Sequence, residues 1–133
     1  MKAPGFLNVD LDIESKSPLR ALACEFGDRV SVMFSGRMRG RHCLYLEAAG
    51  ADSSQDAILD ALCALVEGLS VGGRRVWDTE FDLGYEARLS SERANRFTIR
   101  PDTLRRVARL GATVAVTIYR EDSRTKRIQR TPR

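Results

Sequence analysis

The chain has 133 residues and a formal net charge of +4, and 43% of its residues are hydrophobic and 30% charged. This composition is typical of one soluble globular domain, and the length is sufficient for a buried core without disulfides or a structural metal. No apolar run approaches the roughly 18 residues of a membrane-spanning helix. The first residues lack an apolar stretch of signal-peptide length, so we expect a cytoplasmic protein.

The positive charge is concentrated near the end of the chain. Subtracting the five basic residues of the last segment from the total of +4 leaves residues 1–122 at −1. We therefore predict one domain over residues 1–122 and a basic, disordered tail over residues 123–133. The five basic residues are Arg124, Lys126, Arg127, Arg130 and Arg133.

The first predicted elements are a strand, a short helix and a second strand. Apolar and polar residues alternate over Leu7–Ser15, which indicates a half-buried strand. Ser17 followed by Pro18 is typical of a helix start, and Gly27 is expected to end this helix. Three apolar residues then alternate as a second strand: Val30, Val32 and Phe34.

A further strand and the longest helix follow. We predict a strand over Cys43–Ala48 and a helix over about residues 54–69, with Ser53 or Ser54 as N-cap and Asp56 in the first turn. One face of this helix is apolar and is expected to cover a sheet. The apolar stripe comprises Ile58, Leu62, Leu65 and Leu69.

The last part of the chain repeats this order. The segment FDLGYEA (Phe81–Ala87) predicts a strand, and Phe97–Arg100 predicts another. Asp102 is expected to cap a short helix that ends at Gly111. We predict an α+β two-layer sandwich, a mixed sheet with helices on one face, whose first six elements follow ferredoxin-like order. The final predicted strand contains Val114, Val116 and Ile118.

Two segments resemble each other and suggest an internal duplication. SPLRALACEFGDRVSV and DTLRRVARL-GATVAV align with one gap, and VDLDIES resembles FDLGYEA with Asp10 matching Asp82. We predict that two strand-helix-strand units superpose, with Gly27 over Gly111.

The cysteines and the single histidine do not predict a catalytic or metal centre. Cys24, Cys43 and Cys63 are widely spaced, so neither a zinc site nor any other metal or cofactor site is predicted. Cys24 and Cys63 are expected to be small buried apolar residues in helices. His42 and Cys43 are adjacent on a strand, so their side chains should point to opposite faces.

Paired acids and clustered arginines are the remaining polar candidates. Asp10 with Asp12, and Asp82 with Glu86, sit at even spacing on strands, where they either share a functional face or form the solvated face of a sheet.

The stretch GRMRGRHC places three arginines at spacing two around a glycine turn, where they either clamp phosphates or carboxylates or form a solvated hairpin tip. The candidate binding surface combines this hairpin with the polar loop over Arg88–Arg96. Its predicted binding residues are Arg37, Arg39, Arg41, Arg88, Arg93 and Arg96.

The segments WDTEFDLGYEA, FTIRPDTLRRVARLGA and VAVTIYR resemble a bacterial domain-of-unknown-function family of small single-domain proteins. The resemblance covers roughly residues 76–120 and supplies no catalytic residue, and it implies a link to toxin and immunity loci. It leaves open whether Trp77 is a functional landmark or a core aromatic.

We therefore expect a non-enzymatic protein-binding module, immunity-like in character, with an unknown protein partner. The alternative is weak, nonspecific nucleic-acid binding through the basic tail and the arginine hairpin. Sequence-specific RNA binding is disfavoured because the strands lack the aromatic signature of an RNA-recognition sheet.

Overall fold

The computed structural model describes residues 5–50, 54–69, 77–87 and 96–120. The predicted tail at residues 123–133 lies outside these ranges. In chain order the elements are β1 (Phe6–Ser15), α1 (Arg20–Phe26), the 3-10 turn η1 (Gly27–Arg29), β2 (Val30–Met38), β3 (Arg41–Ala48), α2 (Gln55–Glu67), β4 (Trp77–Ala87), α3 (Pro101–Arg109) and β5 (Thr113–Arg120).

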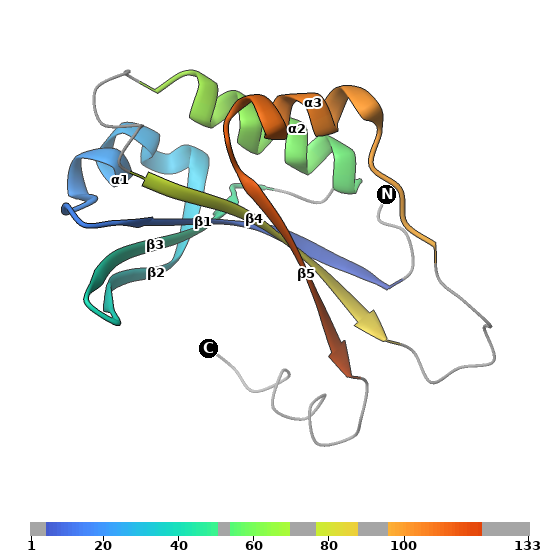
Figure 1. Ribbon diagram of the computed structural model, residues 1–133, viewed down its shortest axis with the longest axis horizontal. Helices are drawn as coiled ribbons and strands as arrows, with labels where there is room; N and C mark the ends of the chain where they lie inside the picture. Colours follow the sequence, from blue (N-terminus) through green and yellow to red (C-terminus); the bar gives the residue numbers. More distant parts are fainter. Residues whose placement is uncertain (1–4, 51–53, 70–76, 88–95, 121–133) are drawn as a thin grey trace.

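The strands form one five-stranded sheet in the order β2-β3-β1-β4-β5. Neighbouring strands are antiparallel except for the parallel pair β4 and β5. Figure 1 shows all three helices on the same side of this sheet. The predicted α+β class, with a mixed sheet and helices on one face, is confirmed.

The core lies between the helices and one face of the sheet. Alternation along β1 directs Val9, Leu11 and Ile13 toward the helices, and all three are almost completely buried. Residues that are paired across neighbouring strands share a face, so Phe81 opposite Leu11 joins the same layer. The helices supply the other half of this core through residues such as Ile58, Leu59, Leu62, Leu22 and Phe26.

The start of α2 and the end of α1 follow the sequence signals. Ser54 Oγ accepts a hydrogen bond from the Ala57 amide at 3.3 Å, which satisfies a backbone donor at the first turn. Gly27 ends α1 with a φ of +61°, a conformation that side-chain-bearing residues rarely adopt.

The predicted caps of α1 and α3 are wrong. Helix α1 begins at Arg20 with Leu19 at the N-cap, because Leu19 is a buried core residue and the helix starts where that side chain is anchored. Helix α3 begins at Pro101 with Arg100 at the N-cap, because proline needs no amide partner in the first turn.

The predicted strand at Phe97–Arg100 is also absent from the described residues. Among the described residues, hydrogen bonds join this segment to the start of α2 and not to a neighbouring strand. The side-chain amide of Gln55 donates to the Thr98 backbone carbonyl at 3.1 Å. The backbone amide of Arg100 donates to the Asp56 carboxylate at 3.2 Å.

A bulge in β2 changes the predicted face of one aromatic residue. Val32 lies opposite Leu46, but after a register shift Phe34 lies opposite Tyr45. Because Leu46 and Tyr45 are successive strand residues, Val32 and Phe34 face opposite sides. Simple alternation placed both on one face.

The structure does not support an internal duplication. Strands β1 and β2 are separated by β3, whereas β4 and β5 are direct neighbours. The aligned residues also differ in environment, because Leu19 is buried and Leu104 is 44% exposed. The repeated Asp-Leu pairs instead lie side by side, with Asp10 directly opposite Asp82 across β1 and β4.

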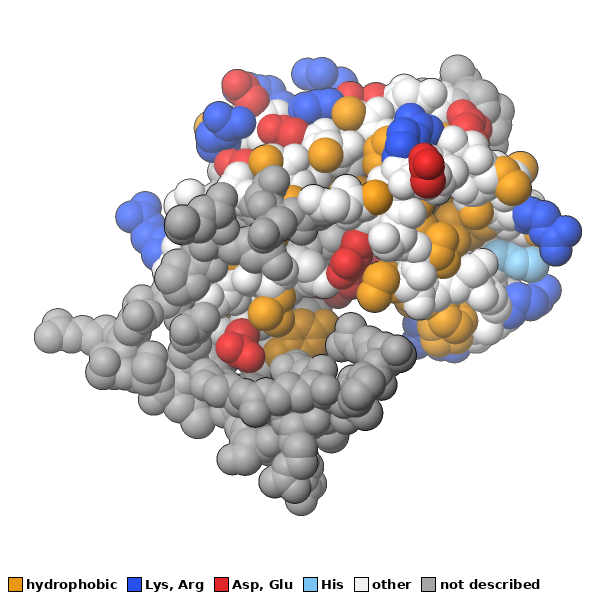
Figure 2. All heavy atoms as spheres, turned by 180° about the vertical axis from the view of Figure 1, so that it is seen from behind, with side chains coloured by type: hydrophobic (Ala, Val, Ile, Leu, Met, Phe, Trp, Pro, Cys, Tyr) orange, Lys and Arg blue, Asp and Glu red, His pale blue; other side chains and the backbone are white. Residues whose placement is uncertain are grey.

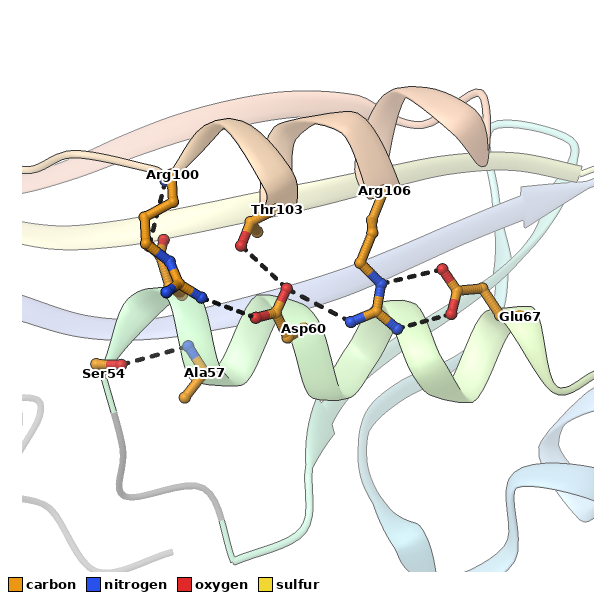
Figure 3. Close-up of polar contacts among 8 residues, drawn as sticks. Ser54, Ala57, Asp60, Glu67, Arg100, Thr103 and Arg106 are labelled. Atoms are coloured by element: carbon orange, nitrogen blue, oxygen red, sulfur yellow. Dashed lines mark hydrogen bonds and ion pairs between the residues drawn. The ribbon is translucent and has the colours of Figure 1, made fainter.

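A polar seam fastens α3 to α2 (Figure 3). Arg106 makes two hydrogen bonds to Glu67, at 2.7 and 3.1 Å, and Thr103 Oγ1 donates to Asp60 at 3.0 Å. Arg100 reaches Asp60 at 3.6 Å. The Arg106 guanidinium holds the pKa of Glu67 below its ordinary value. These bonds orient α3 and thereby the strand that follows it.

Replacing Arg106 with alanine is expected to lower the free energy of unfolding by roughly 1 kcal/mol, because a two-pronged interhelical pair is lost. The matched control is Arg105→Ala, which removes only a solvent-exposed contact to Asp102 within the same helix and should change stability by at most about 0.5 kcal/mol. Urea denaturation measures both. Equal losses for the two variants would contradict the proposed role of the seam.

Candidate functional site

The sheet face opposite the helices, here called the open face, is lined with carboxylates from its three central strands. The register places Asp10 opposite Asp82, and Asp12 between Tyr45 and Glu80, all on one face. The side chains that alternate with the core on β1, β3 and β4 complete the set. Seven of them are here called the open-face acids: Asp10, Asp12, Glu14, Glu47, Asp78, Glu80 and Asp82. Glu86 lies on the same face as Asp82, near the end of β4, and is not counted among them.

Two of these acids have strongly raised pKa values. Burial, a hydrogen bond with Glu47 and the charges of neighbouring acids raise the pKa of Asp10 to about 7. Burial and the charges of Asp82, Glu80 and Glu14 raise the pKa of Asp12 to about 6. Both carboxyls are half-buried, so water only partly screens this repulsion. The open face therefore carries protons near neutral pH.

Polar neighbours order the centre of the face without neutralising it. The Asn8 side-chain amide donates to Asp10 and to Glu47, and Thr117 Oγ1 on β5 donates to Asp82 at 2.7 Å. Gly84 leaves the space for Asn8, because a Cβ at this position would lie 2.6 Å from Asn8 Oδ1. These hydrogen bonds fix where the carboxylates point.

Among the described residues, arginine side chains neutralise open-face acids only at one end of the face. Arg41 contacts Asp78 at 2.8 Å and Glu14 at 3.8 Å, and the Tyr45 hydroxyl donates to Glu14 at 3.3 Å. A cavity of about 280 Å³ lies here, between Tyr45, Arg39 and the acids. Within the described ranges, five open-face acids form no ion pair: Asp10, Asp12, Glu47, Glu80 and Asp82.

The three arginines of the predicted hairpin do not share one side of it. Arg37 lies opposite His42, whereas Arg41 lies opposite Met38, so these two arginines point to opposite faces of the sheet. Arg39 occupies the turn with a φ of +51°. Arg37 and Arg41 stand on the two strands that flank a two-residue turn, and alternation along these strands directs them to opposite faces. Arg41 lies on the open face.

Arg37 lines a separate cavity on the helix side of the sheet. This cavity of about 450 Å³ lies between α1 and the β2–β3 hairpin and includes Arg20, Arg37 and His42 but no acidic residue. In Figure 2 the charged side chains at the right-hand end, which holds the β2–β3 turn, are likewise basic. This end of the molecule can accept an anion, whereas the open face cannot.

The second half of the predicted binding surface is only partly described. Arg88 and Arg93 lie outside the described residues. Arg96 is exposed and lines a cavity of about 250 Å³ together with Asp56 and Phe97. This cavity is distinct from that beside Arg37, so the structure does not bring Arg96 together with the hairpin arginines.

The cysteines and the histidine follow the predictions in part. Cys63 is buried, and burial raises its pKa to about 11. Cys24 is exposed, contrary to prediction, because two residues turn a helix by about 200° and Leu22 occupies the buried side of α1. His42 and Cys43 lie on opposite faces of β3, as predicted.

No group of three or more His, Cys, Asp or Glu side chains within the described segments has an arrangement that could hold a metal ion. None of the described helices is both long and apolar enough to cross a membrane. Trp77 is half-buried and packs against the core.

Comparisons of this chain with protein-family models, curated proteins and solved structures find no match. The resemblance of residues 76–120 to a domain-of-unknown-function family therefore stays a prediction.

Sequence reasoning identified part of the open face and missed its extent. Asp10, Asp12 and Asp82 were recognised as paired acids, but Glu47 and Glu80 were not. Alternation within β3 and β4 contains this signal, since both residues flank buried apolar positions. Only the strand order shows that they surround Asp10 and Asp12.

Protonation of Asp10 should couple stability to pH. A carboxyl whose folded pKa exceeds its unfolded value of 3.8 stabilises the fold while protonated, and this contribution is lost as the pH rises from about 4 through 7. Asp10→Asn should therefore stabilise the protein at pH 8 by roughly 1–2 kcal/mol, a figure reduced by solvent screening of this half-exposed group, and hardly at pH 4.

Urea unfolding at both pH values measures this difference. Asp28→Asn, an exposed position in η1, serves as the control and should show no comparable dependence on pH. A stability gain from Asp10→Asn that is the same at pH 4 and pH 8 would contradict the raised pKa.

Proposed function

We propose that this chain is a non-enzymatic protein-binding module and that a basic segment of its partner lies across the open face. The observation that carries the proposal is the group of five half-buried acids without an ion pair in the described ranges, at whose centre Asp10 and Asp12 have raised pKa values. Cationic side chains from a partner would relieve this repulsion.

The margins of the face favour arginine over lysine in the partner. Phe34 and Tyr45 lie in contact on the open face with ring centroids 5.6 Å apart, and Tyr119 is 41% exposed on β5. A guanidinium group can pair with a carboxylate in two-pronged geometry and stack on an aromatic ring, whereas an ammonium group is a point charge. Carboxylates bordered by aromatic rings suit arginine side chains.

The proposal implies a linked proton release. A bound cation favours the charged form of Asp10, so binding should expel a proton near pH 7 and strengthen as the pH rises from 6 to 8.

For the fold, we infer that the first six elements follow ferredoxin-like order. The inference is supported by the succession strand, helix, strand, strand, helix, strand and by the central position of β1 and β3 among the first four strands. Helix α3 and β5 then extend the sheet beyond β4.

A fluorescent nona-arginine peptide is a suitable probe of the proposed site. Changing Asp10 and Asp82 together to asparagine should weaken peptide binding about tenfold or more, because two carboxylates are neutralised while each side chain keeps its size and one acceptor oxygen. The control changes Asp28 and Asp102 to asparagine, which alters the net charge equally at exposed positions outside the sheet. A chain ending at Asp122 should retain its affinity.

Nucleic-acid binding is the alternative that the same experiment addresses. Phosphates would be repelled by the open face and would require the basic tail or Arg37. Equal weakening by both double variants would contradict the proposal. A second result would also contradict it: the full chain binds a single-stranded oligonucleotide but not the peptide, and the chain ending at Asp122 no longer binds the oligonucleotide.

A further inference from the structure

Strand β5 forms one edge of the sheet, and no strand among the described residues pairs with its outer side. It is parallel to β4 in a continuous register from Thr113 to Arg120. Its helix-side residues form an uncovered apolar row, in which Val114 is 39%, Val116 56% and Ile118 64% exposed. Helix α3 thus leaves this strand largely open.

The other edge of the sheet is built differently. Strand β2 carries a bulge between Val32 and Phe34, and it has the charged residue Arg37 next to its last residue and Arg39 in the turn that follows. Bulges and charges are the common means by which proteins prevent pairing at an exposed edge. Residues 113–119 of β5 have neither feature and contain no proline. This contrast marks β5 as the edge available for pairing.

An apolar groove of about 460 Å³ adjoins the exposed row. Its floor includes Leu83 and Val116, and Phe97 and Ile99 line it from the segment before α3. Phe97 is held against Tyr85 with ring centroids 4.1 Å apart. Side chains added along the outer side of β5 would extend the apolar surface of this groove.

We propose that β5 pairs with β5 of a second copy of this chain, antiparallel about a two-fold axis at Val116, to form a continuous ten-stranded sheet. In this register Val116 faces its own counterpart, Val114 faces Ile118, and Ala115 faces Thr117. All three apolar residues then meet on the helix side, and the small residues Ala115 and Thr117 meet on the open face.

The composition of β5 favours a second copy over an unrelated strand. In the proposed register the β-branched residues Val114, Val116 and Ile118 face only one another, and no residue from 113 to 119 is charged, so self-pairing sets no like charges opposite each other. A shift of the axis by half a residue would set helix-side residues opposite open-face residues. A shift by one full residue, to Ala115, would keep the faces separate but would place Ile118 opposite the small Ala112.

The acidic open faces do not oppose this assembly. Three strand spacings of about 4.8 Å would separate β4 from its counterpart, which is roughly 14 Å. This exceeds the screening length of about 8 Å at physiological salt. The dimer does not depend on the proposed basic partner, and its test uses the full chain alone.

Sedimentation velocity over a concentration series tests the dimer. Val116→Lys sets two ammonium groups against each other on the axis and should raise the dissociation constant about a hundredfold. Val32→Lys is the matched control, because Val32 is a similarly exposed valine (51%) on the helix side of the other edge strand. A monomeric wild type, or dissociation by Val32→Lys alone, would overturn the proposal.

A charge-exchange experiment tests the register. One variant carries lysine at positions 114 and 118 and a second carries glutamate at both positions. Each should be monomeric alone, because like charges face each other, and an equimolar mixture should form a heterodimer. Monomers in the mixture, or homodimers of either variant, would contradict pairing through β5.

Discussion

Coverage of the sheet on one face only is the constraint from which the other properties of this protein follow. Three helices are packed against one side, so every second residue of the central strands is drawn into the core and the alternate residues remain on the open face. In β1 this places Val9, Leu11 and Ile13 under the helices and directs Asp10 and Asp12 to the other side. Hydrophobic burial thus holds like charges together.

The resulting repulsion underlies the proposed function, because a bound cation would relieve it. Acids such as Asp82 are spaced by the strand ladder and cannot move apart without breaking the sheet. Their positions are further fixed by Asn8 and Thr117. The raised pKa of Asp10 means that protonation partly compensates this repulsion in the free protein, and a bound cation would do so more completely.

The sequence predicted local structure well and non-local geometry poorly. The alternation of apolar and polar residues identified β1, and a serine before the apolar stripe identified the cap of α2 at Ser54. Both features depend only on residues that are close together in the sequence. The bulge that turns Phe34 to the open face leaves no periodic signal. Neither did the sequence show that Arg41 would meet the acids of β1 and β4, since this depends on strand order. The extent of the candidate site was missed for the same reason.

The most direct test of this account is a carboxyl-carbon NMR titration of Asp10, with and without the nona-arginine peptide. In the free protein we expect a midpoint near 7 for Asp10 and near 6 for Asp12, and saturating peptide should lower both. A midpoint near 4 for Asp10 in the free protein would show that the fold does not disfavour the ionised form of this carboxyl. The open face would then provide no electrostatic reason to bind a basic partner.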